Sequence, residues 1–417
     1  MKVNSDIYYG DSVPDGIYES IRTLKTERTD FSTINQTGVS NTLSDEYQLI
    51  LDICRSGQKL PTISRMKSEQ ILRGLRKNVN DFYSITALHY LNAGTAGIDH
   101  FHFLLNGLIS NVNLSSLEEL NTVFAHVLNK GHGKDRNNAR SYLTISTCPI
   151  LAKALDIYVQ ELSMSEWNSA QSQMQFQGHG MSHELVCLLL TETLQFSLNV
   201  AKKPVYALFL DAKSAFDRVL RERLIRNLFL IGTDDHRLLH IDNRLGSRRT
   251  FCEFDKVMMG PILDTLGLEQ GGVILLDAYE IYNNEQEDVP QASGLGVYVK
   301  NVCISCITMA DDDVLVSNSI IDQNNLLFLT EQYCSKYDVQ LVPDKIRLLA
   351  FSKIEMDIEY SKEISPITIS NMKIAFSDEA EHLGVIRTSS ATNMTNLMVR
   401  ISAHRAKLLP RSAPTPA

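Results

Sequence analysis

The stretch TMADDDVLV, residues 308–316, sets three consecutive aspartates among apolar and β-forming side chains. The runs on either side, VCISCI and VLVSNS, read as two strands, so the aspartates lie at the tip of a predicted hairpin. Two interpretations are open. The run is a solvated turn, because aspartate favours turns by capping its own backbone, or its carboxylates hold something of opposite charge.

A second strand-terminal carboxylate lies upstream. VYALFLD, residues 205–211, is a short apolar run rich in β-formers that ends at Asp211 and is followed by the helix-like AFDRVLRERLIRNLFL. If the fold brings Asp211 beside Asp311 and Asp312, the like charges raise one another's pKa. Divalent cations remove that cost. Mg²⁺ prefers hard oxygen ligands, and two ions about 3.5 to 4 Å apart clamp an in-line phosphoryl displacement.

An alternative use of LFLDAKSAFD is the nucleophilic aspartate of a haloacid-dehalogenase-type phosphatase, which this segment superficially resembles. That family carries a second aspartate two residues after the first. Position 213 is lysine, so the phosphatase interpretation is disfavoured.

Composition limits the class of protein. The chain has 417 residues, 44% of them apolar, which is enough for two or three domains with a real core. No run of 18 or more apolar residues and no secretion signal is visible, so we expect no membrane insertion. The seven scattered cysteines fit reduced thiols and an intracellular location. Cys303 and Cys306 have C-x-x-C spacing without a second pair, so zinc is not indicated.

Charge gives a mixed signal about nucleic acid. The net charge of −9 argues against a wholly basic surface, although a local basic groove remains open. Arginines cluster in RVLRERLIR, residues 218–226, and RLGSRR, residues 244–249. These clusters are either part of such a groove or solvated helix and loop faces.

The order of elements predicts an α+β fold. Residues 1–62 are polar and read as a poorly ordered extension with one short helix near DEYQLILDICRSG. Residues 63–119 have helical spacing, with a break at AGTAG. From 120 to 388 strands and helices mix, and IRLLAFS and MKIAFS are further strand candidates. This order favours an antiparallel sheet with flanking helices.

Together these segments resemble the reverse transcriptase of a non-LTR (LINE-type) retrotransposon, over roughly residues 120–388. FLDAKSAFDRV resembles its first palm motif, GLEQGGV (267–273) its template and primer motif, and MADDDVL its Ala-Asp-Asp hairpin. LVPDKIRLLAF (341–351) resembles the later lysine motif and HLGV (382–385) the primer-grip hairpin. KGHGKDRNNARSYLTISTCPILAKALD resembles the fingers segment, and QFQGHGMSHE the block that joins fingers to palm.

The resemblance assigns roles to individual residues. Asp211, Asp311 and Asp312 would hold two Mg²⁺ ions, and Phe216 would exclude a ribose 2′-hydroxyl. Gln270 and Gly271 would position the template, and Lys345 would contact the nucleotide's phosphates. Each has a plainer reading as core, turn or surface residue. Gly271 and Gly272 would permit close backbone approach to a base pair.

Departures from the family pattern favour a partly decayed copy. The family's Tyr-Arg-Pro-Ile reads Tyr142, Leu143, Thr144, Ile145 here, so the arginine that grips the triphosphate is missing. Lys130 and Arg140 would substitute in part. Apolar residues 274–276 replace small polar ones, Ile346 replaces a threonine, and Asp313 adds a third negative charge beside the metal pair.

The resemblance implies a right-hand polymerase: fingers and palm over 120–388, and only the start of a truncated thumb over 389–417. Its reaction would be RNA-directed DNA synthesis from deoxynucleoside triphosphates, with an RNA template and a DNA primer as partners. A catalytically inactive remnant that at most binds RNA is the alternative. An RNA-dependent RNA polymerase is disfavoured because Phe216 stands at the sugar-selecting position.

Overall fold

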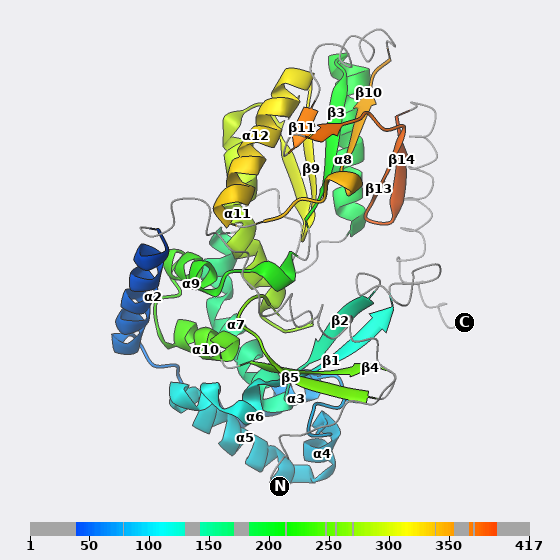
Figure 1. Cartoon of the computed structure of the whole chain (residues 1–417). Coiled ribbons are helices and arrows are strands. Elements are labelled where there is room, and N and C mark those ends of the chain that lie inside the picture. Colours follow the sequence, from blue (N-terminus) through cyan, green and yellow to red (C-terminus); the bar gives the residue numbers. More distant parts are fainter. Residues whose placement is uncertain are drawn as a thin grey trace, which may run out of the picture. The chain divides into compact units, whose positions relative to one another are not determined.

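The computed structural model describes residues 39–77, 79–129, 142–170, 183–212, 215–246, 248–254, 257–268, 271–337, 339–353, 367–369 and 372–389. The chain forms two compact units that interleave along the sequence (Figure 1). Unit 1 comprises Met1–Gln171 and Phe216–Tyr282, and unit 2 comprises Ser172–Ala215 and Asn283–Ala417. The predicted start of a thumb, residues 389–417, lies outside the described residues except for Ser389.

Unit 1 is mostly helical. Its helices are α2 (Val39–Ser56), α3 (Arg65–Gly74), α4 (Ala87–Asn92), α5 (Gly94–Ser110), α6 (Glu118–Asn121), α7 (Ile150–Ala170), α9 (Arg221–Leu230) and α10 (His236–Gly246). α11 (Leu275–Ser293) begins in unit 1, and the division between the units falls within it. The predicted break at AGTAG is confirmed, since α4 ends at Asn92 and α5 begins at Gly94.

The N-terminal helix is longer than the sequence led us to expect. α2 buries Ile50, Leu51 and Cys54 along one side, which is the spacing of an amphipathic helix. The Tyr47 hydroxyl donates to Asp242 at 2.7 Å and ties α2 to α10. Residues from Val39 onward are therefore a packed part of unit 1.

A mixed sheet completes unit 1, with strand order β2-β1-β4-β5. Its strands are β1 (Thr122–Asn129), β2 (Tyr142–Thr147), β4 (Arg249–Phe254) and β5 (Val257–Leu263). β1 pairs with β2 antiparallel and with β4 parallel. The pairing of β1 with β4 joins segments more than 100 residues apart, a link that local periodicity does not reveal.

Unit 2 is built on an antiparallel sheet with strand order β10-β3-β9-β8. Its strands and helices are α8 (His183–Phe196), β3 (Val205–Asp211), β6 (Val297–Val299), β7 (Val302–Ile304), β8 (Cys306–Met309), β9 (Asp312–Ser317), α12 (Ile320–Tyr337), β10 (Arg347–Phe351), β11 (Ile367–Ile369), β12 (Met372–Ile374), β13 (Glu379–His382) and β14 (Val385–Thr388).

The predicted hairpin around the aspartates forms, with one correction. VCISCI is two strands, because Ser305 interrupts it: the Ser305 backbone N–H and hydroxyl both bond to the side-chain oxygen of Gln291. β7 therefore pairs with β6, and only β8 pairs with β9.

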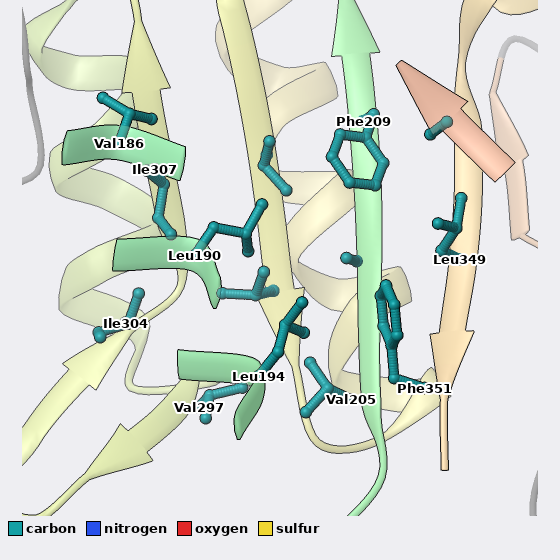
Figure 2. Packing of buried hydrophobic residues seen from close by; sticks show 14 of the residues in the cluster. Val186, Leu190, Leu194, Val205, Phe209, Val297, Ile304, Ile307, Leu349 and Phe351 are labelled. Carbon is teal, nitrogen blue, oxygen red and sulfur yellow. The ribbon is translucent and has the colours of Figure 1, made fainter. Parts of the chain in front are cut away.

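α8 covers one face of the unit 2 sheet. Its side chains Val186, Leu190 and Leu194 pack on Phe209 and Phe351 (Figure 2). The segment His183–Ala201 is long and apolar enough to span a membrane, but 44% of it is buried inside the protein. Its apolar side chains are used in the core of unit 2.

α12 and the short β11–β12 hairpin cover the opposite face. Leu326 and Leu327 of α12 pack with Leu208 and Leu315, together with Ile367 of β11. Because both faces are covered, β3 reads as an unbroken apolar run instead of an alternating one. Helices and mixed sheets together confirm the predicted α+β class.

Truncating the core should lower stability. Leu190→Ala removes a fully buried side chain between α8 and the sheet, so we expect a loss of about 2 to 5 kcal/mol in the free energy of unfolding. Urea unfolding followed by far-ultraviolet circular dichroism measures it. Leu185→Ala on the same helix is the control, because Leu185 is 37% exposed. Equal losses in both variants would contradict this description of the core.

Candidate active site

Asp211 lies where β3 leaves the core. The preceding residues of the strand are buried on both faces, whereas the Asp211 side chain is 34% exposed. The apolar run Val205–Leu210 therefore fixes the strand, and its last residue carries a carboxylate to the edge of the sheet.

The pairing of β3 with β9 brings the second carboxylate to the same place. Asp312 stands directly opposite Asp211, just as Val314 stands opposite Phe209. Side chains of directly opposed residues share a face, with Cβ atoms about 5 Å apart. Asp211 and Asp312 thus lie on the face of the sheet that α8 covers, next in line after the apolar side chains of that face.

The third aspartate sits in the turn. Met309 pairs with Asp312, which leaves Ala310 and Asp311 as the two-residue tip. Ala310 has φ +62°, a left-handed conformation, and a positive φ at the first central position alone is typical of a type II′ turn, where glycine is favoured. A residue with a β-carbon is strained there by about 1 to 2 kcal/mol. Such strain often accompanies functional sites.

Electrostatic repulsion is visible at Asp312. Burial, with the neighbouring Asp311 and Asp211 carboxylates, raises the pKa of Asp312 to about 6. His183, the first residue of α8, and Lys345 act in the opposite direction. The structure therefore gathers like charges whose repulsion a bound cation would relieve.

Asp313 does not stand beside the pair, contrary to our expectation. It pairs with Leu210, on the face that α12 covers, because successive side chains of a strand alternate between faces. It is 3% exposed and accepts a hydrogen bond from Gln286. Burial raises the pKa of Asp313 to about 7, so a large fraction of it is protonated near neutral pH.

Lys345 meets Asp211 directly. A short 3₁₀ turn, Pro343–Lys345, follows the backbone bond from the Val342 N–H to the Asp211 carbonyl, 2.9 Å long. The Lys345 ammonium then donates to both carboxylate oxygens of Asp211, each at 2.9 Å. The Lys345 ammonium thus occupies the carboxylate of Asp211, which is a predicted metal ligand.

The carboxylate oxygens at this site are of the kind that a hard divalent cation binds. Asp211 and Asp312 are adjacent carboxylates at the solvent edge, and Asp211 already binds a positive charge. Within the described parts of the chain, no group of three or more His, Cys, Asp or Glu side chains is drawn together tightly enough to hold a metal ion. Asp211 and Asp312 would therefore supply the first ligands, with Asp311 at the hairpin tip.

Two predicted substrate residues lie in unit 1. The Phe216 ring packs on Tyr279 with centroids 4.4 Å apart. Gly271 has φ +105°, and a β-carbon there would come within 3.0 Å of the Ser146 carbonyl oxygen. Glycine at 271 is thus required by the fold itself. Lys130, Arg140 and Gln270 fall outside the described residues, so their roles stay predictions.

Several arginines of the two basic clusters are held in ion pairs. In the second cluster, Arg244 pairs with Asp156 and Arg248 with Asp264, all four side chains being largely buried. In the first, Arg221 bonds to Asp242. Arg221, Arg244 and Arg248 are therefore held by acidic partners within unit 1, which lie outside the two clusters themselves.

The sequence did not reveal two residues that interact with the aspartates of the hairpin. His183 lowers the pKa of Asp312, and Gln286 bonds to Asp313. The only available signal was the position of His183 directly after the glycine-rich FQGHGMS. The HLGV hairpin forms as predicted, with positive φ at both Leu383 and Gly384, and Arg387 ties it to the Cys187 carbonyl of α8 at 3.1 Å.

Comparison with known proteins identifies similar sequences and folds. Residues 130–386, more than half of the chain, match the family described as reverse transcriptase (RNA-dependent DNA polymerase). No curated protein matches. Among solved structures, 464 chains match. One is apo telomerase from Candida Tropicalis truncated from its C-terminal domain, with 10% identity, a TM-score of 0.45 and 69% of this chain covered. This chain spans 59% of that telomerase chain.

The contribution of Asp312 and Asp313 to the stability of the metal-free protein should fall as pH rises. The folded protein binds protons at Asp312 and Asp313 more tightly than the unfolded chain does, since both pKa values are raised. Their contribution to the free energy of unfolding therefore decreases between about pH 4 and pH 7. Asp312→Asn should reduce this decrease by about 1 to 2 kcal/mol, a figure discounted for partial exposure. Urea titrations at a series of pH values test it.

Two comparisons sharpen that test. Asp378→Asn, an exposed aspartate of unit 2, should leave the pH profile unchanged. Mg²⁺ added at pH 8 should restore stability to the unmodified protein more than to Asp312→Asn. If the unmodified protein and Asp312→Asn show the same pH dependence between about pH 4 and pH 7, the raised pKa of Asp312 is refuted, because the histidines with lowered pKa values, His240 and His382, are common to both proteins.

Lys345 should compete with a divalent cation for Asp211. Removing its charge by Lys345→Met should tighten Mn²⁺ binding, by at most about fivefold because the ion pair is exposed. Electron paramagnetic resonance titration of free Mn²⁺ measures the affinity. Arg347→Met is the matched control, since the Arg347 guanidinium donates to the backbone carbonyls of Asp344 and Ile346. Weaker Mn²⁺ binding in Lys345→Met would contradict this competition.

Proposed function

We propose, given that the chain belongs to the reverse transcriptase (RNA-dependent DNA polymerase) family, that it is an RNA-directed DNA polymerase of a non-LTR (LINE-type) retrotransposon. The family match supports the polymerase fold and the general activity. The order of the motifs from FLDAKSAFD to HLGV supports the subclass. The observation that carries the proposal is the cross-strand pair of Asp211 and Asp312.

The reaction joins a deoxynucleotide to a primer on an RNA template. The primer 3′-hydroxyl gives up its proton to solvent as its oxygen forms a bond to the α-phosphorus of the triphosphate, the bond from that phosphorus to the bridging oxygen breaks, and pyrophosphate leaves. Asp211, Asp311 and Asp312 would hold the two Mg²⁺ ions. When bound, Mg²⁺ supplies Lewis-acid stabilisation of charge on the phosphates.

Lys345 is suited to act on the leaving group. Its ammonium is 62% exposed and is held at this site by the Asp211 carboxylate. Because lysine carries three donors on a flexible stem, it could move from the carboxylate to a phosphate oxygen. There it would neutralise charge and donate a proton from its Nζ atom as pyrophosphate departs.

The remaining roles concern selection and partners. Phe216 would exclude ribonucleotides by occupying the space of a 2′-hydroxyl. Gln270 and Gly271 would position the template, and Lys130 with Arg140 would take over triphosphate contacts that Leu143 cannot make. We propose RNA template, DNA primer and deoxynucleoside triphosphates as partners, recognised chiefly through phosphates and A-form shape. The seven free cysteines support an intracellular location.

Primer extension tests the proposed function. On a poly(rA) template with an oligo(dT) primer, dTTP and Mg²⁺, we expect extension that falls at least about 100-fold in Asp312→Asn and Asp211→Asn. Asp378→Asn should extend normally. Extension that survives both site substitutions would refute the site assignment.

The inactive remnant predicts a different result. No extension by the unmodified chain would favour it, and restoration by Leu143→Arg would trace the loss to the missing triphosphate contact. Preferential incorporation of UTP in the same assay would favour an RNA-dependent RNA polymerase instead.

A further inference from the structure

A buried ion pair in unit 1 does more than neutralise charge. Arg248 and Asp264 meet at 3.1 Å, and their side chains are only 3% and 0% exposed. The Thr250 hydroxyl donates to the same Asp264 carboxylate at 2.9 Å. The Arg248 guanidinium also donates to the Gly267 carbonyl at 2.7 Å. Arg248 directly precedes β4, so its side chain ties the start of this strand to the loop that follows β5.

That loop, Asp264–Leu268, lies against the segment that carries Phe216. The Leu268 N–H donates to the Phe216 carbonyl at 2.8 Å, and the Gly267 N–H donates to the Val219 carbonyl at 2.9 Å. Gly267 has φ +78°, and a β-carbon there would come within 2.7 Å of the Asp217 carbonyl oxygen. The two backbones are in direct contact, so a shift of the loop moves the Phe216 backbone.

Stability alone does not explain this pair. The free energy lost when two charges are removed from water is about as large as the free energy gained from their attraction. Apolar pairs of similar volume often give the same stability. What an apolar pair cannot supply is a directed bond to the Gly267 carbonyl. Arginine suits this task because its rigid fork of donors bonds to a carboxylate and a carbonyl simultaneously.

We propose that Arg248 is a positioning residue that, through Asp264–Leu268, fixes Phe216 and thereby sets the discrimination between deoxynucleotides and ribonucleotides. This inference rests on the proposed function, in which Phe216 selects the sugar. It adds a residue, from a cluster that the sequence suggested was basic surface, to the determinants of specificity.

The test compares two buried pairs of the same kind. Arg248→Met with Asp264→Asn removes both charges together, leaves no buried carboxylate unpaired, and keeps a carbonyl for Thr250. Arg244→Met with Asp156→Asn is the matched control, because the Arg244 guanidinium bonds to the Leu120 carbonyl and Asn121, whereas the Arg248 guanidinium bonds to the Gly267 carbonyl of the loop. Phe216→Val reports the effect of altering the selecting ring itself.

Selectivity is measured as the ratio of kcat/KM for dTTP to that for UTP on poly(rA)·oligo(dT). We expect the ratio to fall about 10-fold in the Arg248/Asp264 double variant, as a displaced selecting group predicts, and to stay within about twofold in the control. Arg248→Lys should lie between them, because an ammonium on a flexible stem lacks the rigid fork of donors that holds the carboxylate and the carbonyl in fixed geometry. An unchanged ratio in a double variant that extends normally overturns the proposal, as does an unchanged ratio in Phe216→Val.

Hydrogen exchange at the Gly267 and Leu268 amides provides a readout independent of polymerisation. Faster exchange in the Arg248/Asp264 double variant, and not in the Arg244/Asp156 control, supports the positioning role. Equal exchange in all variants overturns it. If the unmodified chain does not extend primers, the proposed function fails, and the exchange experiment still decides whether Arg248 positions the loop.

Discussion

The register of β3 against β9 is the constraint on which the site depends. A slip of one residue would turn Asp312 to the opposite face, away from Asp211. What resists the slip is burial on both faces of the sheet, where Phe209 lies opposite Val314 and Leu208 opposite Leu315. Each fully buried apolar side chain contributes about 1.5 to 3 kcal/mol. The burial and repulsion that raise the pKa of Asp312 to about 6 oppose it with about 1 to 2 kcal/mol, so the apolar pairs prevail and the carboxylates stay together.

The negative charge of Asp211, Asp312 and Asp313 is compensated in a different way at each residue. Asp211 takes the Lys345 ammonium as counter-ion, Asp312 retains a proton up to a higher pH, and Asp313 is turned into the interior with Gln286 as its donor. Asp313 is thus compatible with a working site, although its sequence position suggested decay. A cation at the sheet edge would exchange with Lys345 and with the proton of Asp312, which couples metal binding to the release of both.

Positive charge is used differently in unit 1. Arginines that look like a nucleic-acid surface in the sequence are held in ion pairs, two of them with largely buried partners. The pair of Arg248 and Asp264 also braces the loop that contacts the Phe216 segment. If Phe216 selects the sugar as proposed, the residues that pack this part of the core also position the residue that chooses the substrate.

The sequence by itself determined the local elements and the candidate carboxylates. The β-forming run before Asp211, the turn-favouring aspartates between two β-forming runs, and the order of the motifs sufficed for the α+β class and for the family, because these signals are short-range. Other features depended on contacts between distant segments. Only the tertiary structure decided that Asp312 faces Asp211 while Asp313 faces away, that VCISCI divides at Ser305, and that Arg248 is buried on Asp264. The burial and the pairing of a residue depend on the segments that pack against it. Those segments are distant in sequence, so the residues next to it in the chain do not reveal them.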